Sequence, residues 1–167
     1  MILKFLNKNF FINIIIVLLI FILDRISKIY VVSSVKANYS TELFKSKFLN
    51  VSLIWNEGIA FGLFSFSNSN LYNLISLLIG IIIIIIFFMI IKNNNIKKYP
   101  LMMIFAGAIG NLYDRLIYNA VPDFIDFHIG EFHWFIFNIA DIFISVGVFF
   151  MILLELIGSN KSENEIV

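Results

Sequence analysis

The sequence predicts an integral membrane protein built mainly of α-helices, with short strands and an interfacial helix in its connecting segments. Of its 167 residues, 60% are hydrophobic and only 14% are charged, and the mean hydropathy is +0.96. Soluble domains average roughly 45–50% apolar and about 25% charged residues, so this chain has more apolar surface than a small soluble fold can bury. The composition excludes an ordinary soluble enzyme and an intrinsically disordered chain.

Four apolar stretches are long enough to cross a bilayer, whose core about 30 Å thick needs roughly 20 apolar residues in a helix. The apolar run of the first stretch passes directly into Asp24 and Arg25 without a small-residue cleavage site, so we interpret it as a retained helix and not as a signal peptide. No repeat or linker divides the chain, which predicts one membrane domain over 1–167 with a polar, disordered tail at 159–167. The predicted spans are 10–32, 71–91, 100–118 and 134–157.

The connecting segments 33–70 and 119–133 contain alternating apolar positions and turn residues, a pattern typical of short strands. Within the first segment, Thr41–Phe48 predicts an interfacial helix. Lysine is moderately enriched on one side of the predicted spans, which favours a cytoplasmic location for that side. We therefore expect both termini in the cytoplasm and both connecting segments on the outer face. The inner lysines are Lys4, Lys8, Lys92, Lys97, Lys98 and Lys161.

The polar residues of three spans fall at a similar depth near the outer face. On each span they share one helical side, because residues three or four apart are neighbours on a helix. Ionisable groups within a bilayer are costly and indicate a functional site. Asp123, which begins the loop before the fourth span, joins the same region. The span residues are Asp24 and Lys28, then Asn111, Asp114 and Arg115, and finally Asn138 and Asp141.

Structural roles stay open for most of these residues. Acidic and basic neighbours can form ion pairs, and asparagines can hydrogen-bond between helices. Asp141 differs because its own helix offers no cation within one turn, and Asp123 is the nearest unassigned partner. Two carboxylates in a buried site share a proton and can activate water, one as a base and the other as an acid. The spacing of the two residues permits this contact but does not require it.

The remaining composition argues against several other chemistries. The absence of cysteine excludes a disulfide scaffold, a thiol nucleophile and cysteine-bound zinc. A net charge of +1 without a basic stripe argues against nucleic acid as a partner. His128 and His133, with Asp126 and Glu131 nearby, could be metal ligands on an outer loop. Because the H-E-x-x-H spacing is missing, we interpret them as interfacial residues instead. We therefore expect no metal and no cofactor.

Five motifs follow one another along the chain. They are D-x-x-[ST]-K at 24–28, N-x-G-x-A-F within 56–62, G-G-A-x-G-N-x-x-D-R at 106–115, V-x-D-F-I at 121–125 and F-N-x-A-D-x-x-I at 137–144. In this order they resemble bacterial lipoprotein signal peptidase, also called type II signal peptidase. Ala106 replaces the first glycine of its motif, and Pro122 precedes the aspartate of the fourth.

The resemblance implies an aspartyl endopeptidase of the bacterial inner membrane. Such an enzyme removes the signal peptide of diacylglyceryl-modified prolipoproteins, cleaving just before the lipidated cysteine near the outer face. It implies four transmembrane helices, an extracytoplasmic β-cradle and a catalytic dyad of Asp123 and Asp141. Partners would be the prolipoprotein and membrane lipid, and we expect a monomer without a cofactor. Supporting or substrate-binding positions would be Asn111, Arg115, Asn138, Asn56, Gly58, Asp24, Lys28 and Asp114.

Two other classes remain possible on the residues alone. In a small transporter or channel, intramembrane carboxylates would relay protons or bind cations. The acidic groups would then line a path through the membrane, whereas here they gather toward one side. In a membrane scaffold, the same residues would only join helices, and changing Asp to Asn would alter folding and not chemistry.

Overall fold

Four helices and one four-stranded sheet make up the residues that the computed structural model describes, namely 8–58, 69–93 and 95–164. The predicted mainly α class with a small β-structure is confirmed. The second half of the motif at 56–62 lies outside the described residues. In chain order the elements are α1 (Lys8–Asn38), β1 (Glu42–Lys45), β2 (Leu49–Asn56), α2 (Ser69–Lys92), α3 (Lys98–Tyr118), β3 (Val121–Ile129), β4 (Phe132–Phe137) and α4 (Ile139–Asn164).

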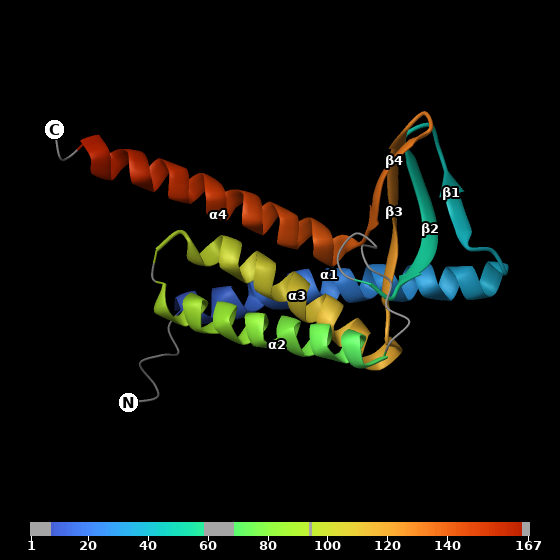
Figure 1. Ribbon diagram of the computed structural model, residues 1–167, viewed down its shortest axis with the longest axis horizontal. Coiled ribbons are helices and arrows are strands. Elements are labelled where there is room, and N and C mark those ends of the chain that lie inside the picture. Colours follow the sequence, from blue (N-terminus) through green and yellow to red (C-terminus); the bar gives the residue numbers. More distant parts are fainter. Residues whose placement is uncertain (1–7, 59–68, 94, 165–167) are drawn as a thin grey trace.

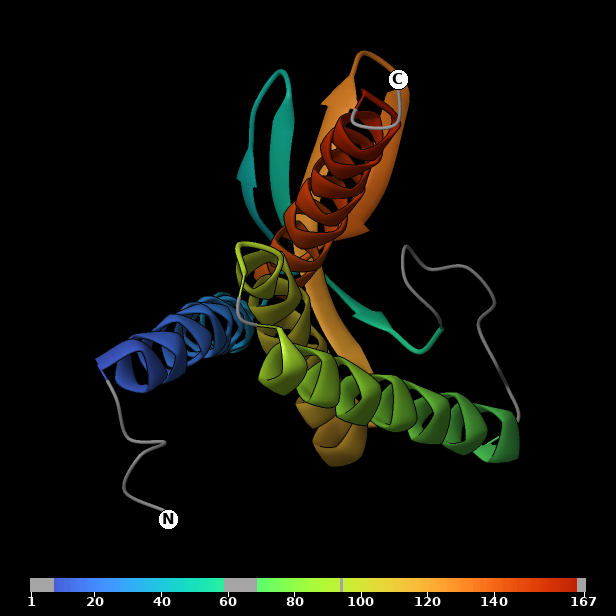
Figure 2. The same cartoon turned by 90° about the vertical axis from the view of Figure 1, so that its left-hand side faces the viewer.

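The helices run in alternating directions, with the sheet at one end of the molecule (Figure 1). α3 contacts each of the other three helices, and Figure 2 shows α1 and α2 on opposite sides of it. Small residues make this packing possible: a Cβ atom on Gly107 would lie 2.5 Å from the carbonyl oxygen of Ala140. Ala106 and Ala140 are fully buried. The helices therefore approach so closely that a larger side chain at Gly107 would force them apart.

The outer faces of the helices are apolar. Leu19 is 55% exposed on α1 and Leu116 is 67% exposed on α3, and exposed isoleucines, leucines and phenylalanines also cover α2 and α4. By length and composition, two helices among the described residues are suited to cross a membrane, over Asn70–Lys92 and Ile139–Gly158. Continuous exposed apolar surface of this kind marks contact with a membrane or a partner.

The sheet has the order β1-β2-β3-β4, and all of its neighbouring strands are antiparallel. Val31 of α1 packs against Leu53 of β2 and Phe124 of β3, and all three side chains are buried. α1 continues beyond the predicted end at residue 32 to Asn38, and Val35 in this extension packs on the same cluster. The extension of α1 thus supports the sheet.

Several local predictions about secondary structure are wrong. The interfacial helix expected at Thr41–Phe48 is replaced by β1 and a turn, because Ser46 bonds to both the amide and the carbonyl of Leu49 and β1 pairs with β2. The fourth helix begins at Ile139 and not at residue 134, because 132–137 pair with β3. The tail is helical as far as Asn164 instead of disordered from 159.

Candidate active site

Asp123 lies at the centre of a set of amide donors. It belongs to β3, and not to a loop as the sequence predicts, and its side chain is 3% exposed. The amide nitrogen of Asn56 donates to one carboxylate oxygen at 2.8 Å, and that of Asn138 donates to the other at 2.6 Å. Asn56 ends β2 and pairs in register with Val121, while Asn138 follows β4. The ends of two strands therefore place donors on both oxygens.

Asp141 is held at the start of α4 by a reciprocal pair of hydrogen bonds with Asn138. The backbone N–H of Asp141 donates to Asn138 Oδ1 at 3.2 Å, and the backbone N–H of Asn138 donates to Asp141 Oδ2 at 3.1 Å. This is a capping box, in which the residue before the helix and the third helical residue satisfy each other's free amides. Because the side-chain amide of Asn138 also donates to Asp123, this one residue connects the two carboxylates, through its backbone N–H to Asp141 and through its side chain to Asp123.

A buried ion network lies between α1 and α3, next to Asp141. Lys28 Nζ lies 2.9 Å from Asp24 and 2.7 Å from Asp114, and it donates to Asn111 Oδ1 at 2.8 Å. Asn111 in turn donates to Asp141 at 2.8 Å. Hydrogen bonds therefore run from the Lys28 cation to the carboxylate of Asp141.

Arg25 completes this network, although sequence reasoning gave it no role. Its guanidinium pairs with both Asp24 and Asp114, and it donates to the carbonyl of Gly110 at 3.0 Å. Asp114 therefore pairs with cations of α1 and not with Arg115, its neighbour in the sequence. The signal for Arg25 is its place inside the motif at 24–28, but a position one residue from Asp24 does not reveal that it reaches α3.

Arg115 joins the cavity to the end of β2. Its Nη2 donates to the carbonyl of Gly58 at 2.6 Å, and its guanidinium lies over the ring of Tyr72. Asn56 Oδ1 accepts from the backbone N–H of Gly58 at 2.9 Å, which ties this carbonyl to the Asp123 group. Within the described ranges, the buried Nε and Nη1 atoms of Arg115 have no hydrogen-bond partner. These donors are available to a bound ligand.

Asp123 and Asp141 line the same cavity of about 630 Å³. Its polar end also includes Asn56, Asn111, Arg115 and Asn138. Its other walls are apolar and come mainly from one side of α4, with a contribution from α2. These apolar lining residues include Ile79, Ile144, Val148, Phe149 and Ile152. The cavity can therefore accept an extended apolar group with its polar end at the two carboxylates.

Burial is the larger cause, and the charge of Asp141 the smaller one, of a rise in the pKa of Asp123 from its ordinary 3.8 to about 6. The amide donors of Asn138 and Asn56 oppose this rise because they favour the ionised form. Asp123 thus exchanges its proton near neutral pH. A buried carboxyl group with such a pKa, next to a second carboxylate, is suited to general acid–base catalysis.

Proteins of known family are similar to this chain over most of its length. The family model described as signal peptidase (SPase) II matches residues 16–157. The chain belongs to the signal peptidase II family. The lipoprotein signal peptidase of Pelagibacter ubique (strain HTCC1062) is 54% identical over 158 residues, covering 95% of each chain. That of Anaplasma marginale (strain Florida) is 37% identical and covers 93% of this chain and 90% of its own.

Two solved structures described as bacterial membrane enzymes have a similar fold. One aligns with a TM-score of 0.67 and 28% identity over 90% of both chains. The other aligns with a TM-score of 0.70 and 31% identity over 86% of this chain and 91% of its own. The resemblance to lipoprotein signal peptidases is therefore confirmed, and the signal peptidase II family consists of bacterial membrane peptidases that process lipoproteins.

Loss of Lys28 should destabilise the protein far more than loss of an exposed lysine. Lys28→Met leaves Asp24 and Asp114 with Arg25 alone, and removal of one partner from a buried ionic group costs about 3–5 kcal/mol. Lys97→Met is the matched control, because it breaks only the exposed pair with Glu155, worth about 0–1 kcal/mol. Thermal unfolding in detergent, followed by tryptophan fluorescence, measures both. Equal losses of stability in Lys28→Met and Lys97→Met would contradict a buried ion network around Lys28.

The pKa of Asp123 predicts a specific pH dependence of stability. The folded state holds this proton more tightly than the unfolded chain, so the free energy of unfolding falls as pH rises from about 4 to about 7. The contribution is at most about 3 kcal/mol. Asp123→Asn removes it, so the melting temperature of the variant rises relative to wild type over this range. Glu131→Gln, which changes an exposed carboxylate of the β3–β4 turn, is the control and should track wild type. If the difference in melting temperature between Asp123→Asn and wild type stayed constant over this pH range, that would be evidence against the raised pKa.

Proposed function

We propose that this protein is an aspartyl endopeptidase that removes the signal peptide of diacylglyceryl-modified prolipoproteins by cleaving just before the lipidated cysteine. The observation that carries this proposal is that Asp123 and Asp141, from different elements, line one cavity and are connected through Asn138. Membership of the signal peptidase II family supports the peptidase activity and the prolipoprotein substrate.

In the proposed reaction, the two carboxyl groups share one proton. The ionised carboxylate removes a proton from water, the water oxygen attacks the scissile carbonyl, and the protonated carboxyl group donates to the carbonyl oxygen. Proton transfer to the amide nitrogen then breaks the C–N bond and releases the signal peptide. The positive end of the α4 dipole favours the charged form of Asp141, which lies in the first turn of that helix.

Neighbouring residues orient the dyad and the substrate in this mechanism. Asn111, itself bonded to Lys28, orients Asp141. The free guanidinium nitrogens of Arg115 are placed to bind carbonyl groups of the substrate backbone. The apolar walls of the cavity along α4 suit a signal peptide or acyl chains, which are themselves apolar. No metal or organic cofactor takes part in these steps. All of these residues come from one chain, which suits a monomer.

The proposed location is the bacterial inner membrane, with four spans in a single membrane domain and both termini in the cytoplasm. Exposed apolar residues on α1 and α3, in addition to the two most apolar helices, support four spans. The alternating helix directions bring the sheet and the start of α4 to one end (Figure 1), and Asp123 on β3 and Asp141 in the first turn of α4 lie there with them. Lys92, Lys97 and Lys98 flank the α2–α3 connection at the other end, consistent with an inner position for it.

The proposed topology can be tested by labelling single cysteines, because the natural chain has none. Glu131→Cys lies on the exposed β3–β4 turn, and Ile96→Cys lies on the exposed α2–α3 connection. A membrane-impermeant maleimide added to intact spheroplasts should label the first and not the second, whereas both should react after the membrane is opened. The reverse pattern, or equal labelling in intact spheroplasts, would rule out this orientation.

The proposed mechanism predicts that Asp123→Asn and Asp141→Asn each lower the cleavage rate by at least about 100-fold, the contribution expected of a general acid or base. The assay uses purified enzyme in detergent with a diacylglyceryl-modified prolipoprotein, with and without a chelator. Glu131→Gln is the control for loss of an exposed carboxylate and should cleave normally. Size-exclusion profiles establish that the variants are folded. Near-normal cleavage by folded Asp141→Asn would exclude the dyad.

A further inference from the structure

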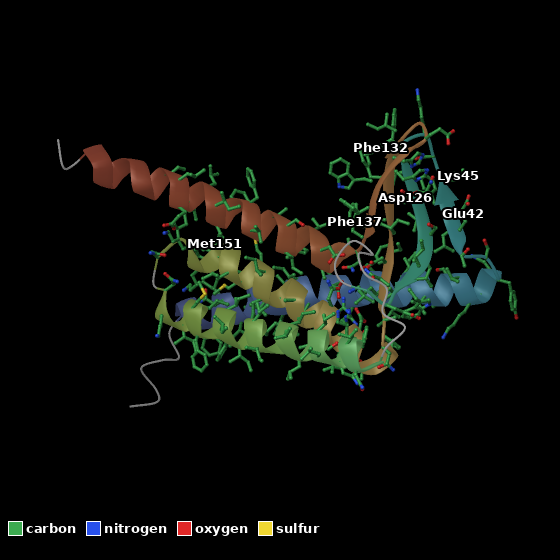
Figure 3. The ribbon with its side chains drawn as sticks, in the orientation of Figure 1. Glu42, Lys45, Asp126, Phe132, Phe137 and Met151 are labelled. Carbon is green, nitrogen blue, oxygen red and sulfur yellow. The ribbon has the colours of Figure 1, made fainter. Side chains whose placement is uncertain are left out.

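A second polar cluster lies within the sheet, away from the dyad. His128 of β3 and His133 of β4 are cross-strand partners, and their rings stack with centroids 4.9 Å apart. One nitrogen of each ring and a carboxylate oxygen of Asp126 all lie within 4.8 Å of one another. Figure 3 labels Asp126 within the sheet, and none of the three residues lines the active-site cavity. Sequence reasoning placed these histidines on a loop, whereas they belong to strands.

One ring nitrogen in this cluster lacks a partner. His128 is 9% exposed, and its Nδ1 atom is buried without a hydrogen-bond partner in the part of the chain that the structure describes. Burying such a polar atom is unfavourable unless something satisfies it. The neighbouring ring of His133 already contacts Asp126 through Nδ1 at 2.9 Å. The free nitrogen of His128 therefore indicates that the cluster accepts a further group.

The remaining contacts hold the cluster in place from β2 and its preceding turn. Asn50 of β2 donates to Asp126 Oδ2 at 3.1 Å, and the backbone N–H of His128 donates to the carbonyl of Phe48 at 3.0 Å. Metal sites in proteins characteristically have ligands that are fixed in this way by neighbouring hydrogen bonds. The side chain of His133 is 51% exposed, which leaves a route from solvent to the cluster.

We propose that Asp126, His128 and His133 bind a divalent late transition metal, of which Zn²⁺ is the representative. Two imidazoles and one carboxylate suit Zn²⁺, Co²⁺, Ni²⁺ or Cu²⁺ better than Mg²⁺ or Ca²⁺, which prefer oxygen ligands. In a tetrahedral site, metal–ligand distances of about 2.0–2.2 Å place the ligand atoms roughly 3.4 Å from one another. Rotation of the two histidine side chains out of their stacked arrangement brings the ligand atoms together around one ion, and the fourth position stays open to water. The site lies outside the proposed peptidase mechanism.

A bound metal would link β3 to β4. One of these two strands, β3, also carries Asp123. Its ligands come from both strands, and Asn50 extends the connection to β2. A ligand that binds only the folded state stabilises it by an amount that grows with the logarithm of the ligand concentration relative to its dissociation constant. Zn²⁺ should therefore raise the melting temperature of the protein, an effect that does not depend on cleavage of a substrate.

The test uses the full chain in detergent, purified with a tag that contains no histidine and stripped with a chelator. Because the chain has two histidines and no cysteine, imidazole-based binding must come from His128 and His133. Isothermal titration with Zn²⁺ should give one site per chain, and Co²⁺ should give the visible absorption of a four-coordinate site with nitrogen ligands. His128→Ala, His133→Ala and Asp126→Asn should each weaken binding at least tenfold.

Glu131→Gln is the matched control, because it removes a nearby carboxylate that does not belong to the cluster, and its affinity should equal that of wild type. If a histidine variant fails to fold, the Co²⁺ spectrum of wild type and its loss on addition of Zn²⁺ still decide the question. The proposal is wrong if wild type binds neither ion at one equivalent, or if folded His128→Ala with His133→Ala binds as tightly as wild type.

Discussion

The structure depends on cations and hydrogen-bond donors that neutralise the charges of carboxylates buried where the helices meet the sheet. Asp24 and Asp114 are fully buried and Asp123 is nearly so, and an unpaired charge in such surroundings costs several kcal/mol. Lys28 lies between the first two, and amide side chains carry the hydrogen bonding onward to Asp141 and Asp123. Removing any member leaves a charge or a donor without its partner. The packing of α1, α3 and α4 is consequently inseparable from the polar site.

The buried carboxylates can reach their hydrogen-bond donors only because the helices pack closely. Asp24 accepts a hydrogen bond from the backbone N–H of Ala140, which requires α1 to approach the first turn of α4. Gly110 lies between them, and a Cβ atom there would be 2.7 Å from Asp24 Oδ2. A carboxylate can thus reach the free amides at the start of α4 only where α3 presents a residue without a side chain. Gly110 therefore serves both the close packing of the helices and the access of the Asp24 carboxylate to these amides.

Much of the fold and site can be predicted from the sequence because helical periodicity and motif order are local signals. They place Asp24 with Lys28, and Asn111 with Asp114, on single helical faces. Strand registers are not local, however. The run 132–137 is apolar and aromatic enough for a membrane helix, and only its pairing with β3 makes it a strand. The same limitation hides the His128–His133 pair and the reach of Arg25 to Asp114, because both contacts join separate elements.

The sheet also determines where the active site can lie relative to the bilayer. β1 and β4 are the edges of an open sheet, and unpaired backbone groups at such edges cannot be exposed to hydrocarbon. The sheet therefore belongs outside the bilayer core, and the junction of β4 with α4 marks the boundary on the proposed topology. Asp123 lies on the strand side of this junction and Asp141 lies on the helix side. In the proposed mechanism, water then reaches the dyad from the sheet side, and the lipid-anchored substrate enters along the apolar wall of α4.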